Sequence, residues 1–288
     1  MFKRQTSGAV VCTSCGQLVA VNDATCYNCG RRNPGLWGYA PALRSLGHDL
    51  GFVTFVTGFC VIVYVMTLLA SRGDIGFGGI FNLLSPANGA LLAFGASGAI
   101  PVFQLDRWWT VLSAAWLHGG LLHIFFNMYW IRQLATPVAD MYGPGRMIIA
   151  YTVASITGFL ASSTAGLLIG PVPFVGGGLM TVGASAPVFG LLGALVYYGR
   201  RSGSSHVHGQ AMSLAGIMFV FGLLMPGIDN WAHAGGFAGG YLAGRWLDPL
   251  KPERIDHLLM AVVCLVVSVL SVIVSVLHWW WLGGFSLG

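Results

Sequence analysis

Two neutral polar side chains stand where apolar segments begin, and together they could perform nucleophilic catalysis. Ser185 follows Gly183-Ala and opens one apolar stretch, whereas His233 opens another within Asn230-Trp-Ala-His233. A serine hydroxyl is a weak nucleophile until a neighbouring base such as histidine takes its proton. Each residue also has a plainer interpretation, because a lone membrane serine usually packs helices and a lone histidine often anchors a span at the interface.

A second polar cluster opens another apolar stretch, His118-Gly-Gly-Leu-Leu-His123-Ile-Phe-Phe-Asn127. Positions 123 and 127 are four residues apart, so on a helix they share one face. A purely structural hydrogen-bond network is the alternative interpretation of this pair, and for His118 the structural role is favoured.

The composition indicates how these side chains are positioned. Of the 288 residues, 56% are hydrophobic and only 8% are charged, whereas a soluble domain carries about 25% charged residues. So few charges cannot cover a water-facing surface, and several apolar stretches are about long enough to cross roughly 30 Å of hydrocarbon as helices. We therefore predict an all-α polytopic membrane protein with seven spans, at residues 50–70, 117–136, 147–168, 186–200, 211–226, 231–247 and 257–282.

Two segments between and within these spans are unusual. Residues 71–116 are rich in Gly, Pro and Trp, and we predict an ordered interfacial segment there rather than a helix. The fourth span is too short to cross at about 1.5 Å per residue, so its outer end must lie below the surface, reached through the uncharged loop 170–178. Irregular backbone at that depth is tolerated where it lines a water-filled cavity, which predicts a wet cavity with Ser185 at its floor.

The basic residues indicate the orientation in the membrane. If the N-terminus is cytoplasmic, twelve of the 14 Lys and Arg residues lie on the cytoplasmic side and only Arg72 and Arg107 lie outside, which is a strong positive-inside bias. Seven crossings then place the C-terminus outside. These loops explain the net charge of +5, so no nucleic-acid partner is expected. Spans two, four and six all run inward, which places Ser185, His233 and the 123/127 pair at similar depth near the outer face.

Small residues would let the fourth and sixth spans approach closely. They recur every four residues, as Ala186, Gly190 and Ala194 in one span and Gly236, Gly240 and Gly244 in the other. This pattern lets helix backbones touch, and a Ser–His hydrogen bond of roughly 2.6–3.2 Å needs such an approach.

Four cysteines form a separate site near the N-terminus. Cys12-Thr-Ser-Cys15 and Cys26-Tyr-Asn-Cys29 are two C-x-x-C pairs, each followed by Gly, and two such pairs supply four thiolates for one tetrahedral zinc. A disulfide pair or a redox C-x-x-C motif is the weaker alternative, because disulfides are rare in the cytoplasm. We predict a zinc-ribbon-like module at residues 1–35 that docks a cytoplasmic protein partner, a linker at 36–49 and a membrane domain at 50–288.

The acidic residues and the missing metal motif disfavour other membrane functions. All nine acidic residues fall in loops or at span ends. An intramembrane aspartyl protease needs paired carboxylates within the bilayer, and a proton-coupled transporter usually keeps an acid in its path. The H-E-x-x-H motif of membrane zinc proteases does not occur in the sequence.

Three motifs together resemble the rhomboid intramembrane proteases: G-x-S before a Gly-rich helix, A-H-x-x-G-x-x-x-G after it, and H-x-x-x-x-H-x-x-x-N before it, over about residues 95–248. The resemblance implies a Ser185–His233 dyad without an Asp, in which His233 is the general base. It implies an oxyanion hole from His123, Asn127 and the Ser185 backbone N–H, with His118 ordering the first loop. It also implies a six-helix rhomboid-like core plus one extra C-terminal transmembrane helix.

The same resemblance implies an intramembrane serine endopeptidase that cleaves single-span membrane proteins near the outer face of the lipid bilayer. No cofactor is expected for catalysis, and the zinc is expected to be structural. A bacterial cytoplasmic membrane is the expected location. The alternative is a catalytically inactive rhomboid-like adaptor that binds client transmembrane helices, although such relatives typically lack the Ser or the His, and both are present here.

The chain departs from the family pattern at two places. Many members have Gly after the nucleophile, where this chain has Ala186-Pro187, and Pro is well tolerated in the first turn of a helix. Many also carry Trp-Arg in the first loop, where Thr110 stands in place of the Arg. The Gly-Ala-Ser-Gly sequence around Ser97 matches the family's nucleophile motif more closely than the sequence around Ser185 does. It opens no long apolar helix, however, and we predict that Ser97 is not the nucleophile.

Overall fold

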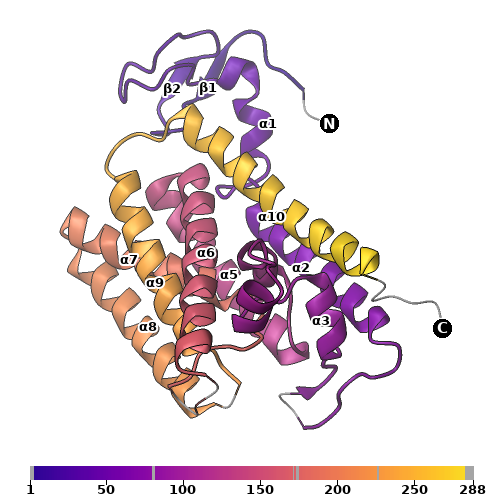
Figure 1. Cartoon of the computed structure of the whole chain (residues 1–288). Helices are drawn as coiled ribbons and strands as arrows, with labels where there is room; N and C mark the ends of the chain where they lie inside the picture. Colours follow the sequence, from indigo (N-terminus) through magenta and orange to yellow (C-terminus); the bar gives the residue numbers. More distant parts are fainter. Residues whose placement is uncertain (1–2, 80–81, 171, 173–174, 226, 283–288) are drawn as a thin grey trace.

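The computed structural model describes residues 3–79, 82–170, 172, 175–225 and 227–282, and the described chain is mainly helical (Figure 1). The long helices fall at the predicted apolar stretches, so the all-α fold class is confirmed. Their bounds are α2 Phe52–Ala70, α5 Leu121–Tyr142, α6 Pro144–Leu168, α7 Ser185–Ser202, α8 Ser205–Leu224, α9 Asn230–Leu247 and α10 Ile255–Trp281.

Four of these helices, α2, α6, α8 and α10, are long and apolar enough on their own to cross a membrane. A fifth crossing is formed if the segment Thr110–Trp116 and α5, which meet at 95°, count as one bent span. The chain is therefore an integral multi-pass membrane protein. The predicted number of seven crossings exceeds this count, since α7 and α9 are not among the described helices that are long and apolar enough to cross. Seven crossings therefore stays a prediction.

Helices α6, α7 and α9 form the centre of the bundle. In the most apolar 18-residue stretch of each helix, 67% of the stretch is buried inside the protein for α6, compared with 17% for α8 and 28% for α10. Helix α9 packs against both α6 and α7, and the backbones meet where the small residues recur. A Cβ on Gly240 would lie 1.9 Å from the carbonyl oxygen of Gly190, and one on Gly236 would lie 2.1 Å from that of Ala186.

Helix α7 is longer than the sequence suggested. It extends past the predicted end at residue 200 and has 18 residues, which is about 27 Å at 1.5 Å per residue. This is still shorter than the roughly 30 Å of a hydrocarbon core, and the last turn of α7 carries Arg200 and Arg201. The shortness of the fourth span therefore stays a prediction. In the preceding loop 170–178, residues 171 and 173–174 lie outside the described residues, and the wet cavity stays a prediction.

The segment 71–116 is only partly as predicted, since it contains short helical pieces within its ordered path. These are α3 Asn88–Phe94, a π-helical turn at Ile100–Gln104, α4 Thr110–Ser113 and a 3-10 turn at Ala114–Trp116. Residues 80–81 lie outside the described part of the chain. Each piece is too short to be stable alone, so tertiary contacts must hold the segment.

Arg107 supplies two of those contacts and is almost completely buried, with only 1% of its surface exposed. Its Nη1 donates to the carbonyl oxygen of Leu92 at 2.7 Å, and its Nη2 donates to that of Ser275 on α10 at 3.2 Å. Trp109 Nε1 donates to Ser275 Oγ at 3.0 Å. Although Thr110 replaces the expected Arg, Arg107 thus ties the loop to the extra C-terminal helix.

The N-terminal module lies at one end of the bundle, beside the start of α10 (Figure 1). It contains an antiparallel pair, β1 Ala9–Val11 and β2 Leu18–Ala20. The predicted linker 36–49 is not extended, because it holds a 3-10 turn, Leu36–Gly38, and α1, Ala40–Arg44.

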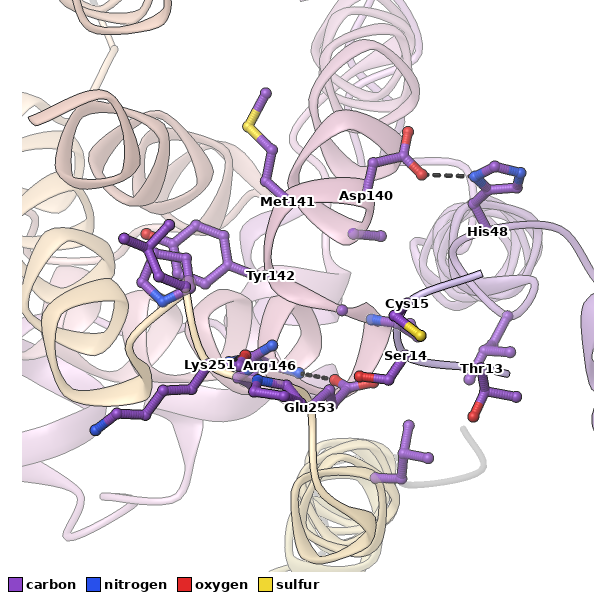
Figure 2. A pocket seen from close by; sticks show the side chains of 18 of the residues that line it. Thr13, Ser14, Cys15, His48, Asp140, Met141, Tyr142, Arg146, Lys251 and Glu253 are labelled. Carbon is purple, nitrogen blue, oxygen red and sulfur yellow. Dashed lines mark hydrogen bonds and ion pairs between the residues drawn. The ribbon is translucent and has the colours of Figure 1, made fainter. Parts of the chain in front are cut away.

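The module packs on the membrane domain around Glu253, which lies between α9 and α10. Arg31 Nη1 donates to the Glu253 carbonyl oxygen at 2.9 Å, and the Glu253 carboxylate accepts from the backbone N–H of Arg146 at 3.0 Å. Burial raises the pKa of the Glu253 carboxyl above its ordinary value. A cavity of about 600 Å³ lies beside this contact. Figure 2 shows side chains that line it, among them Cys15 of the module and Tyr142 and Lys251 of the membrane domain.

Candidate active site

Ser185 and His233 meet where α7 and α9 begin. His233 Nε2 lies 2.9 Å from Ser185 Oγ, although the two residues are 48 positions apart in sequence. Ser185 is the first residue of α7 and is partly exposed, whereas His233 is buried in the first turn of α9. The backbone contact of Gly236 with Ala186 holds the two helix starts together.

The imidazole of His233 lies flat against the ring of Phe189. The ring centroids are 4.2 Å apart and the planes differ by 15°. Phe189 follows Ser185 by four residues, so both side chains project from one face of α7. We assigned no role to Phe189 from the sequence. The spacing of four residues from Ser185 was the sole feature of the sequence that could have indicated one.

Stacking on Phe189 fixes the plane of the His233 ring, so that Nε2 is directed at the serine. For Nε2 to accept the hydroxyl proton of Ser185, the neutral ring must carry its own proton on Nδ1. Within the described part of the chain, Nδ1 has no hydrogen-bond partner. Stacking on Phe189 and the packing of α7 against α9 therefore orient the pair. No third polar side chain among the described residues bonds Nδ1 of His233.

His123 and Asn127 lie four residues apart on one face of α5. The Gly119 backbone N–H donates to His123 Nδ1 at 3.2 Å, so a neutral His123 ring carries its proton on Nε2. That nitrogen is directed at Gly183, where an added Cβ would lie 2.5 Å from it. Gly183 also has φ +129°, a conformation that L side chains rarely adopt, so glycine suits this position twice over.

Asn127 is buried, and its Nδ2 donates to the carbonyl oxygen of His123 at 2.9 Å. The amide nitrogen has a second hydrogen, which leaves one donor for a ligand. The structure thus places His123 beside the residues that precede Ser185, and Asn127 one turn farther along α5.

His118 is completely buried before the start of α5. Its ring meets that of His123 edge to face, with centroids 5.2 Å apart. Among the described residues neither of its ring nitrogens has a hydrogen-bond partner. It packs against a member of the candidate site without contacting Ser185 or His233 in any hydrogen bond that the described residues form.

Ser97 forms an antiparallel bridge with Thr181, in the segment that leads to Ser185. Its backbone N–H donates to the carbonyl oxygen of Thr181 at 3.0 Å, and the N–H of Thr181 donates back to that of Ser97 at 2.7 Å. The side chain is fully buried beside Thr110. The structure therefore gives Ser97 a packing position.

The four cysteines of the N-terminal module form one cluster. Their sulfur atoms all lie within 4.8 Å of one another, with Cys12 and Cys29 3.8 Å apart and Cys15 and Cys26 3.6 Å apart. A tetrahedral zinc with Zn–S bonds of about 2.3 Å needs S–S separations of about 3.8 Å. The cluster fits such an ion, and four thiolates leave no open position on it.

The fold and the pair at 185 and 233 define a polytopic helical membrane protein with a Ser–His site near the starts of two packed helices. Residues 105–249 match the Rhomboid domain, which is about half of the chain. The chain belongs to the rhomboid family.

Named relatives agree with this assignment. The chain is 31% identical to "Rhomboid protease GluP" of Bacillus subtilis over 191 residues, which cover 65% of this chain and 35% of that protein. It is 30% identical to "RHOMBOID-like protein 4" of Arabidopsis thaliana over 206 residues, covering 67% of this chain and 50% of that protein. It is 23% identical to "Rhomboid-like protease 3" of Toxoplasma gondii over 194 residues. The chain thus spans about half or less of the first two relatives.

Proposed function

We propose that this protein is an intramembrane serine endopeptidase in which Ser185 is the nucleophile and His233 is the base. The observation that carries the proposal is the 2.9 Å contact between Ser185 Oγ and His233 Nε2. It occurs inside the matched rhomboid region, on two helices whose backbones touch.

The reaction follows from this contact. Ser185 Oγ attacks the carbonyl carbon of a peptide bond while its proton passes to His233 Nε2. The imidazolium then gives that proton to the departing amine, which leaves an acyl-serine. A water molecule attacks the acyl carbon with His233 again acting as base, and the product carboxylate leaves with Ser185 restored.

In this proposal, three donors stabilise the carbonyl oxygen as it acquires negative charge. The Ser185 N–H stands at the start of α7, where a helix leaves its first N–H groups without intrahelical partners. His123 Nε2–H and the second hydrogen of Asn127 Nδ2 complete the set. Donors fixed before the reaction stabilise the oxyanion without reorganising. His118, packed on His123, orients that ring.

The substrates of this proposal are single-span membrane proteins in a lipid bilayer, cleaved near the outer face. The bias of Lys and Arg supports a cytoplasmic N-terminus and a C-terminus outside. The membrane of this proposal is a bacterial cytoplasmic membrane. The module at residues 1–35 then faces the cytoplasm, holds one structural zinc through its four cysteines, and docks a cytoplasmic protein partner. The linker at 36–49 joins it to the protease domain at 50–288.

The test compares cleavage of a single-span reporter by the purified wild type, Ser185→Ala and His233→Ala. Labelling by a fluorophosphonate, which reacts with an activated serine, is measured on the same proteins. The wild type is expected to cleave the reporter and to carry the label on Ser185, and both variants are expected to fall to background.

Two serine variants serve as controls. Ser163→Ala removes a buried hydroxyl of α6 that has no hydrogen-bond partner among the described residues, and Ser97→Ala removes the literal motif serine. Both are expected to keep cleaving and to keep the label on Ser185. Loss of labelling in Ser97→Ala alone would move the nucleophile, and a folded wild type that neither cleaves nor labels would favour the inactive adaptor.

A further inference from the structure

Asp229 occupies a junction just before the helix that carries His233. It is the N-cap of α9, and its Oδ1 accepts from the Ala232 backbone N–H at 3.0 Å. Its carbonyl oxygen accepts from the His233 N–H at 3.2 Å. Asp229 therefore defines where the first turn of α9 begins, one turn before the imidazole.

The other carboxylate oxygen of Asp229 reaches across to α6. Asp229 Oδ2 accepts a short hydrogen bond from Ser162 Oγ, and Ser162 is completely buried. The serine hydroxyl also accepts from the Gly178 backbone N–H at 3.1 Å. One hydroxyl thus connects α6, the cap of α9 and the segment that leads to Ser185.

Gly178 fits this junction only because it lacks a side chain. A Cβ there would lie 2.8 Å from Ser162 Oγ and 2.9 Å from Asp229 Oδ2. Beyond Gly178 the chain is held by further bonds, since the carbonyl oxygen of Gly178 accepts from the Ala99 N–H at 2.9 Å. Seven residues later this segment reaches Ser185.

We propose that Asp229 and Ser162 are positioning residues that set the approach of His233 to Ser185. This inference rests on the proposed function of that pair. Without the carboxylate, the first turn of α9 loses its cap and its link to α6, and the segment before Ser185 loses its link to α9. Neither residue contacts the reacting atoms, so the effect is on alignment.

The experiment uses the full-length protein with Asp229→Ala, Ser162→Ala and Asp229→Asn. Misplacement of a catalytic group by about 1 Å costs about 10²-fold, so Asp229→Ala is expected to lower kcat and the fluorophosphonate labelling rate by roughly 10- to 100-fold, with KM within about twofold. Ser162→Ala is expected to act in the same direction. Asp229→Asn is expected to recover most of the rate, because an amide oxygen still caps the helix and the amide group still bonds Ser162.

Ser204→Ala is the matched control, because Ser204 is the N-cap of α8 and accepts from the Val207 N–H at 3.3 Å. It removes a cap that is not attached to the dyad, and it is expected to leave kcat and labelling unchanged at a temperature where every variant is folded.

The outcomes separate this inference from the proposed function. An unlabelled wild type would contradict the proposed function itself. A labelled wild type with equal kcat and labelling in Asp229→Ala and Ser162→Ala would overturn the positioning role alone, as would an equal loss in Ser204→Ala. If Asp229→Ala does not fold, the labelling rate of Ser162→Ala decides the question.

Discussion

Replacing Gly236 with alanine is expected to separate the helices that carry Ser185 and His233. A Cβ at position 236 would lie 2.1 Å from the carbonyl oxygen of Ala186 and 2.8 Å from its carbonyl carbon. Both are backbone atoms, so no side-chain rotation relieves the clash. Ordinary contact begins near 3.4 Å, and α9 must therefore move from α7 by the difference from 2.1 Å, about 1.3 Å.

That displacement is large for a hydrogen bond between the two proposed catalytic groups. The Ser185 Oγ to His233 Nε2 distance is 2.9 Å, and hydrogen bonds weaken beyond about 3.2 Å. We expect kcat to fall about 10²-fold, the typical cost of a misplacement of about 1 Å. KM should change little, because no side chain that faces the substrate is altered. The added methyl group should also destabilise the fold by about 1–3 kcal/mol.

The assay is reporter cleavage in liposomes together with fluorophosphonate labelling, each well below the melting temperature of the variant. Gly216→Ala in α8 and Gly58→Ala in α2 are matched controls, because a Cβ at either position meets no atom within 4 Å. Both controls should retain wild-type rates. A folded Gly236→Ala protein that cleaves and labels like the wild type would refute the idea that backbone contact sets the dyad distance.

Three further changes have distinct expected results. His123→Ala and Asn127→Ala should each lower kcat about 10²-fold with a smaller effect on KM, because oxyanion donors act in the transition state. Unchanged turnover in the double variant would show that the two residues have structural roles alone. The purified protein should contain one zinc by elemental analysis, and Cys26→Ser should lose it while keeping kcat within about threefold. The reason is distance: Arg146, beside the module, and Ser162, near the site, are 16 positions apart on α6, which is about 24 Å. Arg107→Ala should destabilise the protein by about 3 kcal/mol, because two charge-assisted bonds are lost; an unchanged melting temperature would contradict that estimate.

The sequence predicted the long helices well and the short ones poorly. Each long helix overlaps a predicted apolar stretch. The length and hydropathy of a stretch are local properties of the sequence, and the thickness of the bilayer selects for both. The pieces within 71–116 depend instead on distant partners. Arg107 bonds Leu92 and Ser275, and the second of these is 168 positions away. A pattern in the neighbouring sequence does not predict a hydrogen bond between residues so far apart along the chain.

The candidate site shows the same division. Small residues every four positions predicted that the fourth and sixth spans would meet, and their backbones do touch at Gly236 and Gly240. Phe189 and Asp229 went unnoticed, because each acts through a partner on another helix. An aspartate just before an apolar segment reads as a helix cap, and only the fold shows that its second oxygen reaches Ser162.

The distribution of close contacts separates the part of the bundle that must be rigid from the part that can vary. The proposed catalytic groups stand on α7 and α9, whose backbones touch each other and pack on the buried helix α6. Such contacts have little freedom, since a single methyl group cannot be added at Gly236 or Gly240 without moving backbone. Most of the apolar stretch of α8 and of α10 is not buried inside the protein. Lipid can replace protein neighbours on these surfaces. We therefore expect substitutions on the lipid-facing sides of α8 and α10 to leave the distance between Ser185 and His233 unchanged.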